Sequence, residues 1–172
     1  MDMPSVKFCV CVKETVDFTA DGTDETEFCI ATNPGDPLQP LARIASGGEL
    51  ARIMLALKSV LNDRDGVATA VFDEVDTGIS GKTSRKIGIK LSQIAKRTQV
   101  LCVTHSAQIA SLASAHYKIS KTLQESAAHS TVTLLDDKGR VEEVARILGG
   151  LCVTEAQKSA ARDMIEEGRA LR

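Results

Sequence analysis

The spacing of apolar residues near the start of the chain predicts a pair of strands. Between residues 5 and 12 every second side chain is apolar, which is the period of a half-buried strand. The apolar members of this face are Val6, Phe8, Val10 and Val12. A second strand is expected at residues 26–32, and the turn-forming sequence at 21–24 predicts that the two strands run antiparallel. The Asn-Pro-Gly-Asp-Pro sequence at 33–37 then interrupts regular structure.

From residue 48 onward the apolar period lengthens to three and four, which predicts a helix that ends near residues 62–66. The side chains expected to face inward are Leu50, Ile53, Met54, Leu57 and Leu61. A second amphipathic helix is expected at 82–96, with its inward face formed by Ile87, Leu91, Ile94 and Ala95. Continuous apolar runs flank this helix, one ending at Phe72 and the other spanning 99–104. The strand–helix–strand order predicts two parallel strands that are buried on both faces.

The last third of the chain is expected to hold short elements followed by a helical tail. The short elements are a helix at 107–114, strands at 116–120 and 130–135, and a turn at 136–139. The tail begins with Thr154 as N-cap, and Gln157 three residues later completes a capping box. The chain is therefore expected to be α/β, with a mostly parallel buried sheet flanked by helices and an N-terminal antiparallel strand pair.

At 172 residues the chain suits a single lobe. Residues 1–40 should form the strand pair and a loop, residues 41–120 the parallel core, and residues 121–172 a strand, a turn and C-terminal helices. The net charge of -2 gives no overall attraction to nucleic acid. A basic cluster at Arg85, Lys86 and Lys90 is expected to be the solvated face of a helix.

The five cysteines, which include no C-x-x-C pair, are typical of reduced, intracellular thiols. Cys9 and Cys11 lack the further ligands that a tetrahedral metal site needs. Cys102 lies in an apolar run, where a cysteine usually acts as a small hydrophobe. Because the sequence shows no signal peptide and no apolar run of membrane length, the expected location is the cytoplasm, without a membrane partner.

The sequence Gly81-Lys82-Thr83 has the ending of a phosphate-binding P-loop, G-x-x-x-x-G-K-[ST]. The first glycine of that motif is missing, because the fifth residue before Gly81 is Asp76. A carboxylate at this position would repel the phosphates that the loop should surround. A calcium-binding loop is excluded as well, because its spacing would require oxygen ligands at Val75 and Thr77 and a glutamate further on.

Acids and a histidine follow the two buried strands. Asp73 and Glu74 come directly after the first strand, and Thr104 and His105 close the second. Because the carboxyl ends of neighbouring parallel strands share one edge, these side chains should lie together. Each pair alone is typical of a helix cap or a solvated turn, but the two pairs together favour a site.

Asp73 has the chemistry to hold Mg²⁺ on a nucleotide, Glu74 to orient or deprotonate a water, and His105 to sense a terminal phosphate. A serine hydrolase that uses Ser106 with His105 is disfavoured, because adjacent residues seldom reach each other and no G-x-S-x-G elbow is present.

The sequence Ser46-Gly47-Gly48-Glu49 stands directly before the strongest predicted helix. Two glycines at a helix start allow the backbone to approach an anion closely, and the unpaired N–H groups and the macrodipole attract it. The plainer alternative is an ordinary loop in which Ser46 serves as N-cap.

In this order the three motifs resemble the ABC-type ATPase heads, and among them the heads of structural-maintenance-of-chromosomes (SMC) proteins. Longer stretches are similar to the C-terminal part of the RecN family of bacterial DNA-repair proteins. They are NPGDPLQPLARIASGGELARIMLALKSVL, FDEVDTGISGK and QVLCVTHSAQIAS. The resemblance spans most of the chain, from about Phe8 to the final helices, and it implies the C-terminal lobe of an ABC/SMC-type P-loop NTPase head.

The resemblance also implies a role for each motif. Residues 46–49 would be the signature motif, which contacts the terminal phosphate of ATP bound to the opposite subunit. Asp73 and Glu74 would be the Walker B metal aspartate and catalytic glutamate, and His105 would be the switch histidine. The loop expected to exchange contacts across the dimer contains Asp76, Gly78 and Ser80. Most such heads carry an aspartate at the position of Ser80, so the usual role of that residue stays open.

Two features of such heads do not occur in the sequence: a Walker A motif and a long heptad region for a coiled coil. We therefore expect the C-terminal fragment of a longer protein, whose partner is the N-terminal half that carries Walker A. Two complete heads would sandwich two ATP molecules with Mg²⁺ in a homodimer at the bacterial nucleoid, and hydrolysis would serve recombinational repair of DNA double-strand breaks. The isolated fragment would be inactive. The alternatives are a non-catalytic dimerisation or DNA- or protein-binding module, and the head fragment of another SMC-like chromosome or recombination ATPase.

Overall fold

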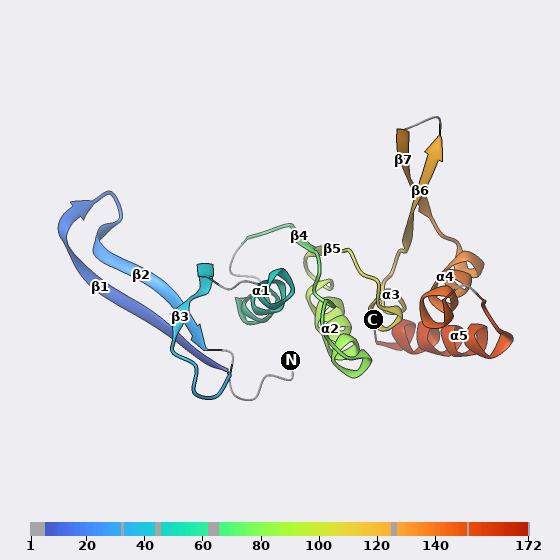
Figure 1. Ribbon diagram of the computed structural model, residues 1–172, viewed down its shortest axis with the longest axis horizontal. Coiled ribbons are helices and arrows are strands. Elements are labelled where there is room, and N and C mark those ends of the chain that lie inside the picture. The colour runs from blue at the N-terminus through green and yellow to red at the C-terminus, as the bar shows by residue number, and fades with distance from the viewer. Residues whose placement is uncertain are drawn as a thin grey trace.

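The computed structural model describes residues 6–31, 33–43, 46–61, 66–124, 127–150 and 152–171. Three parts follow one another along the longest axis of the chain (Figure 1). They are a long N-terminal hairpin, a central α/β unit, and a C-terminal unit of helices from which a second hairpin projects. The described residues form one three-stranded sheet and two two-stranded sheets.

The N-terminal hairpin consists of β1 (Lys7–Thr19) and β2 (Gly22–Ala31), and the short strand β3 (Gln39–Pro40) pairs with β2. The predicted antiparallel pairing of β1 and β2 is confirmed. The turn predicted at residues 21–24 is correct only at residue 21. Gly22 already belongs to β2 and pairs with Thr19 of β1, so the predicted turn is wrong at residues 22–24. Gly22 has a φ of +113°, a conformation that favours glycine at the end of this tight turn.

The apolar face of the hairpin is open to solvent. Phe8, Val10 and Val12 are 45, 48 and 60% exposed. Phe8 stacks on Phe28 of β2, with ring centroids 5.6 Å apart. The expectation that the apolar face is the buried one is therefore wrong, because no element in the described part of the chain covers it; the face of β1 that carries the cysteines is the half-buried one.

The central unit alternates helices and strands: α1 (Gly47–Leu61), β4 (Thr69–Phe72), α2 (Gly81–Ile94) and β5 (Gln99–Cys102). Strands β4 and β5 pair in parallel with Phe72 opposite Cys102, as predicted. One core joins them to both helices, and its buried members are Leu55, Phe72, Val75, Ile87, Leu91, Ile94 and Ile109. Burial of such a side chain contributes about 1.5–3 kcal/mol, so this core fixes the ends of the strands relative to both helices.

Only one face of the β4–β5 pair is covered. Val71, Leu101 and Val103 point away from the core and are 66, 51 and 52% exposed. The prediction that these strands are buried on both faces is therefore wrong for the described chain. Helices α1 and α2 contribute to the same core, and they leave the other side of the strands open.

Helix α1 turns a different face inward than its apolar stripe predicts. Its buried residues are Gly48, Arg52, Ile53 and Leu55. Of the predicted stripe, Leu50, Met54 and Leu61 are instead 37, 48 and 47% exposed. In α2 the predicted inward residues are buried except Ala95, which lies just beyond the helix and is exposed. The exposed stripe of α1 thus adds a third open apolar surface to those on the hairpin and on the β4–β5 pair.

The C-terminal unit contains α3 (Ala107–Ala110), β6 (Tyr117–Gln124), β7 (Ala127–Leu134), α4 (Asp137–Gly149) and α5 (Glu155–Ala170). The turn predicted at 136–139 is wrong, because these residues are the N-cap and first turn of α4. The side chain of Asp136 accepts a hydrogen bond from the N–H of Gly139 at 2.7 Å, which is a capping contact. The predicted capping box of α5 is confirmed, with Thr154 and Gln157 in reciprocal contact.

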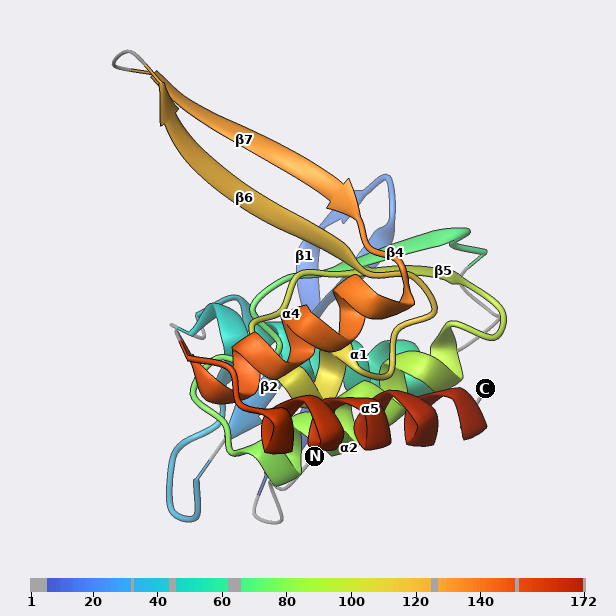
Figure 2. The ribbon, with the colours of Figure 1, turned by 90° about the vertical axis from the view of Figure 1, so that its right-hand side faces the viewer.

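Helix α5 packs against the end of α3 and also reaches the central unit. A Cβ built on Gly168 would lie 2.6 Å from the carbonyl oxygen of Ser111, so only glycine allows this close packing. Arg85 of α2 forms an ion pair with Glu167 of α5 at 2.7 Å. Figure 2 shows the β6–β7 hairpin extending away from α4 and α5. The α/β fold with an antiparallel strand pair, a parallel sheet and flanking helices is confirmed.

Candidate functional site

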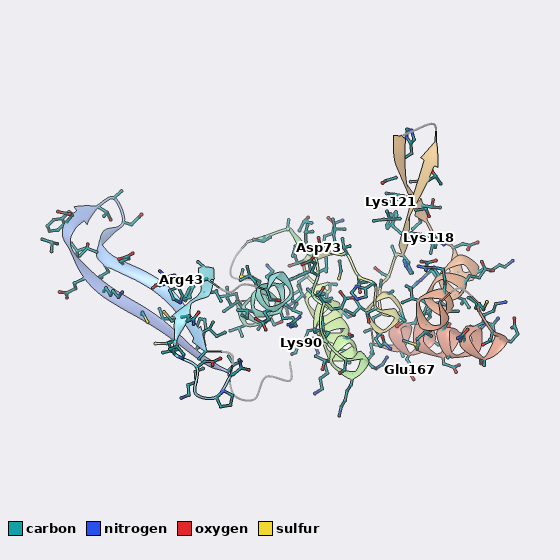
Figure 3. The ribbon with its side chains drawn as sticks, viewed as in Figure 1. Arg43, Asp73, Lys90, Lys118, Lys121 and Glu167 are labelled. Carbon is teal, nitrogen blue, oxygen red and sulfur yellow. The ribbon has the colours of Figure 1, made fainter. Side chains whose placement is uncertain are left out.

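The ends of β4 and β5 bring the predicted site residues to one edge. Because the two strands are parallel and in register, Asp73 and Glu74 leave the sheet beside Thr104 and His105. Figure 3 labels Asp73 at this edge of the central unit. The expectation that Glu74 and His105 leave the sheet at the same edge is met by the pairing of the strands.

Asp73 and Glu74 are both exposed, and the backbone of Glu74 is strained. The N–H of Glu74 donates a hydrogen bond to Oδ1 of Asp73 at 2.9 Å. Glu74 has a φ of +57°, and it is the one non-glycine residue with a positive φ among the residues that the structure describes. A left-handed backbone costs a non-glycine residue about 1–2 kcal/mol, and such strain is concentrated at functional sites. The fold therefore holds Glu74 in a conformation that an ordinary surface turn avoids.

The start of α1 lies against Glu74 and the residues that follow it. A Cβ built on Gly47 would lie 2.8 Å from Oε2 of Glu74. A Cβ built on Gly48 would lie 3.0 Å from the carbonyl oxygen of Glu74 and 3.2 Å from Cβ of Thr77. Gly48 thus needs glycine because the backbone of the loop after β4 approaches it closely, whereas at Gly47 the nearest atom is the end of the Glu74 side chain.

Arg52, one turn into α1, ties the helix to the same loop. Its Nη1 donates to the carbonyl oxygen of Thr77 at 2.9 Å, and the residue is only 9% exposed. Arg52 was not among the residues predicted from the sequence. The sequence feature that indicates its inward position is its spacing of four residues from Gly48, which places both residues on one face of the helix.

Ser46 and Glu49 lie at the exposed end of α1. The side chain of Ser46 accepts from the N–H of Glu49 at 3.5 Å, and its carbonyl oxygen accepts from the N–H of Leu50 at 3.1 Å. Ser46 is therefore placed as an N-cap residue. The remaining unpaired N–H groups of the first turn face the same helix start and are able to bind an anion there.

The loop between β4 and α2 separates into a buried and an exposed part. Asp76 is buried, with its side chain 1% exposed, whereas Gly78 and Ser80 are exposed. Gly78 has a φ of +72°, which favours glycine. Ser80 is the N-cap residue of α2 without a capping hydrogen bond from its side chain. Of the three residues expected to face a second subunit, Gly78 and Ser80 are accessible to one, and the carboxylate of Asp76 faces the interior of its own chain.

His105 lies on the loop after β5 with its imidazole 78% exposed. Three groups of this loop approach Oδ2 of Asp76: the hydroxyl of Thr104 donates at 2.5 Å, the N–H of His105 donates at 3.0 Å, and Nδ1 of His105 lies at 3.5 Å. The hydroxyl of Thr104 also accepts from the N–H of Ser106 at 3.0 Å. Thr104 is a second residue whose contacts were not predicted from the sequence.

The donors at this edge fit a magnesium ion that arrives with a nucleotide. In the described residues no three His, Cys, Asp or Glu side chains are arranged to hold a metal ion. Mg²⁺ is commonly bound by one or two carboxylates, waters and substrate phosphates, and does not need a complete protein cage. A single exposed carboxylate, that of Asp73, is consistent with this mode of binding.

Negative charge near the strand ends affects the half-buried thiol of Cys102. Burial, and then the nearby carboxylates of Asp76 and Asp73, raise the pKa of Cys102 to about 12. Cys102 also packs against the core between the helices and the strands. It therefore behaves as the small hydrophobe predicted from the sequence.

The C-terminal unit has two surface hollows of about 450 and 380 Å³. Residues of β6, α4 and α5 contribute to their walls, and the edge that carries Asp73 and His105 does not. In the first hollow Glu143 accepts from Arg146 at 2.6 and 3.0 Å and pairs with Lys118 at 2.8 Å. These contacts, with Arg146 contributing most, lower the pKa of Glu143 to about 2.

Curated proteins similar to this chain are DNA repair proteins named RecN. The RecN of Halalkalibacterium halodurans is 42% identical over 94% of the chain and 28% of its own length. That of Xylella fastidiosa is 46% identical over 86% of the chain and 26% of its own length. That of Bacillus subtilis is 38% identical over 90% of the chain and 27% of its own length. The chain thus spans little more than a quarter of the relatives that it matches, and no family model matches it.

Solved structures with a similar fold are heads of SMC proteins. One, from work on the ATP-driven dimerization and DNA-stimulated activation of SMC ATPases, superposes with a TM-score of 0.51 at 15% identity. It covers 87% of this chain and 85% of that chain. The Smc head domain of Pyrococcus yayanosii, with its coiled coil and joint, gives a TM-score of 0.55 at 14% identity over 97% of this chain and 26% of that chain.

Within the described residues, no helix combines the length and the apolar character needed to cross a membrane. The SMC head structures show the fold, and the RecN sequences are similar to the chain at much higher identity. Both agree with the resemblance found in the sequence: over most of its length the chain is similar to RecN DNA-repair proteins, and it has the fold of an SMC head domain.

Proposed function

We propose that the chain is the C-terminal lobe of the ATPase head of a RecN-type protein, which binds and hydrolyses ATP during recombinational repair of DNA double-strand breaks. The observation that carries this proposal is the meeting of three separate sequence motifs at one edge. The start of α1 lies against Glu74, and Asp76 joins the same loop to Thr104 and His105. Ordinary packing does not require an acid pair, a glycine-rich helix start and an exposed histidine at one place.

Each group at the edge has a role that suits its position. Asp73 would hold the Mg²⁺ of a bound nucleotide, and that ion would neutralise charge on the phosphates. Glu74, held in a strained backbone at the end of β4, would orient or deprotonate the attacking water. His105, whose ring is largely exposed, would contact the terminal phosphate. The chain supplies these groups, and the lysine and backbone cradle of a P-loop would come from elsewhere.

The partner that supplies the P-loop would be the N-terminal half of the same protein. Three open apolar surfaces support this: the hairpin face with Phe8, the sheet face with Leu101, and the α1 stripe with Met54. Exposed apolar patches are typical of an interface. Two complete heads would then form a homodimer around ATP, in which residues 46–49 meet the nucleotide of the opposite subunit and the loop with Asp76, Gly78 and Ser80 lies near the dimer axis. DNA would be a partner of the complete protein, in the bacterial cytoplasm at the nucleoid.

The test is ATP hydrolysis by this chain co-expressed with the N-terminal half. The complex should hydrolyse ATP in the presence of Mg²⁺, and Glu74→Gln should reduce kcat by at least about 100-fold while leaving ATP binding in place. Glu142→Gln, a change of an exposed glutamate on α4, is the matched control and should retain the wild-type rate. The isolated chain should bind ATP weakly and show no turnover.

A second candidate is a non-catalytic module for dimerisation or for binding DNA or protein. The open apolar surfaces favour it as well, because they need a partner whether or not the site turns over. This candidate is favoured if both halves form a well-folded complex that dimerises or binds DNA or another protein but does not hydrolyse ATP. Another SMC-like chromosome or recombination ATPase would pass the hydrolysis test too, but the identity of 38–46% to RecN proteins supports the RecN assignment.

A further inference from the structure

Asp76 connects the two loops that carry the proposed catalytic groups. It follows Glu74 on the loop after β4, and its carboxylate reaches the loop after β5. Its side chain is 1% exposed, so solvent does not weaken the contacts that it makes. One oxygen, Oδ2, receives the Thr104 hydroxyl and the His105 N–H, and Nδ1 of the same histidine lies 3.5 Å away.

These contacts determine which nitrogen of His105 can meet a ligand. The nitrogen that faces a carboxylate carries the proton, because the carboxylate accepts and does not donate. Nδ1 is directed at Oδ2, and the side chain of His105 as a whole is 78% exposed, so the other ring nitrogen, Nε2, faces away from the carboxylate. Only Nε2 is therefore presented at the edge where the phosphate of a nucleotide would lie.

A purely structural role does not account for this arrangement. The second oxygen of Asp76, Oδ1, is buried and has no hydrogen-bond partner in the described part of the chain. An unpaired buried acceptor is unfavourable, and an uncharged residue could link two loops without it. Local features that oppose stability are expected mainly where function requires them.

We infer that Asp76 is the positioning residue of His105: it fixes the imidazole with Nδ1 inward and Nε2 outward, and it holds the loop of His105 to the loop of Glu74. This inference rests on the proposed ATPase function. Asp76 does not itself touch the nucleotide, since its carboxylate is buried. It acts through His105, and that dependence can be measured.

The first measurement is a double-mutant cycle on ATP hydrolysis by the complex of this chain with the N-terminal half. Asp76→Asn should lower kcat by about 10- to 100-fold, the range found when a residue that orients an active group is removed, and should leave KM for ATP within about twofold. In the His105→Gln background the same change should have no further effect, because the residue through which it acts is gone. Asp163→Asn, at an exposed position of α5, is the control.

The second measurement is the ¹⁵N spectrum of the histidine rings in the same complex at alkaline pH, with His105 assigned by its loss in His105→Gln. The wild type should show the proton on Nδ1, and Asp76→Asn should move it toward Nε2.

If the wild-type complex hydrolyses no ATP, the proposed function fails and the ring spectrum alone decides the positioning role. The inference is overturned if the proton position is unchanged in Asp76→Asn, or if the loss of kcat is equally large with and without His105. Thr104→Val, which removes one donor to the same carboxylate, replaces Asp76→Asn in the double-mutant cycle if that variant does not fold.

Discussion

Gly47 and Glu74 meet at the edge of the central unit: a Cβ built on Gly47 would lie 2.8 Å from Oε2 of Glu74. The start of a helix and the end of a strand thus touch within one chain. A carboxylate is favourable at a helix N-terminus, where unpaired N–H groups carry partial positive charge. A nucleotide phosphate at the same helix start would compete with the carboxylate for these groups.

The two glycines at this contact should respond differently to substitution. A methyl group on Gly48 would meet the backbone oxygen of Glu74 at 3.0 Å, whereas one on Gly47 would meet only the end of the Glu74 side chain. Gly48→Ala should therefore lower the free energy of unfolding by about 1–3 kcal/mol, as overpacking does. Gly47→Ala should change it by less than about 0.5 kcal/mol, since a side chain moves more easily than a backbone. Urea denaturation of both variants checks this, and equal losses would contradict the closer backbone approach at Gly48.

The strained backbone of Glu74 predicts a gain in stability when the residue is replaced by glycine. Glycine adopts a φ of +57° without a steric penalty, so Glu74→Gly should raise the free energy of unfolding by about 1 kcal/mol relative to Glu74→Ala. Both variants lose the carboxylate, so their difference isolates the backbone. A glycine variant that is no more stable than the alanine variant in thermal unfolding would show that Glu74 is not held in the left-handed region.

The raised pKa of Cys102 predicts that its thiol resists alkylation. With a pKa of about 12, almost none of the thiol is ionised at pH 8, and the thiolate is the reactive form. Iodoacetamide at pH 8 should therefore modify the exposed Cys152 well before Cys102 in the folded protein. Peptide mass spectrometry measures both sites, and the urea-unfolded protein, in which both should react, is the control. Early modification of Cys102 in the folded protein would contradict the burial of its thiol.

The lowered pKa of Glu143 predicts a pH-dependent contribution to stability. A carboxylate whose pKa falls from 4.5 to about 2 on folding stabilises the fold above its ordinary pKa, and this contribution is lost as pH falls from about 4.5 to about 2. Glu143→Gln should therefore cost about 1–2 kcal/mol at neutral pH, because Arg146 and Lys118 lose a shared partner, and the difference from wild type should shrink across that window. Urea denaturation as a function of pH measures it, with Glu142→Gln as the exposed control. A difference that is constant from pH 7 to pH 2 would exclude a lowered pKa as its cause.

The sequence was sufficient to predict the elements that position the site. The parallel pairing of β4 and β5 follows from two apolar runs on either side of a helix, and this pairing brings Asp73 near His105. The capping box at Thr154 and Gln157 is a local pattern, so it too was predictable from the sequence. The start of α4 was mistaken for a turn, because Asp136 and Gly139 suit a turn and a helix start equally well.

Burial was harder to predict than secondary structure. An apolar stripe on a strand or helix indicates a surface that is buried against another segment. The stripe alone does not show whether that segment belongs to the same chain. Met54 and Val71 are exposed in the described chain although both lie in apolar patterns. The contacts of Asp76 with Thr104 and of Arg52 with Thr77 could not be predicted, because they join segments that are distant in the sequence, although the spacing from Gly48 does place Arg52 on the inner face of α1.

The central claim is that the site is completed by a second head, and a mixing experiment tests it most directly. Two inactive variants of the complex of both halves are prepared, Ser46→Arg at the helix start and Glu74→Gln at the acid pair, with different tags to confirm that mixed dimers form. If residues 46–49 act on the nucleotide of the opposite subunit, each mixed dimer contains one intact site, and an equal mixture should recover about a quarter of the wild-type ATPase rate. A mixture that forms such dimers but remains as inactive as its two parents would contradict the claim.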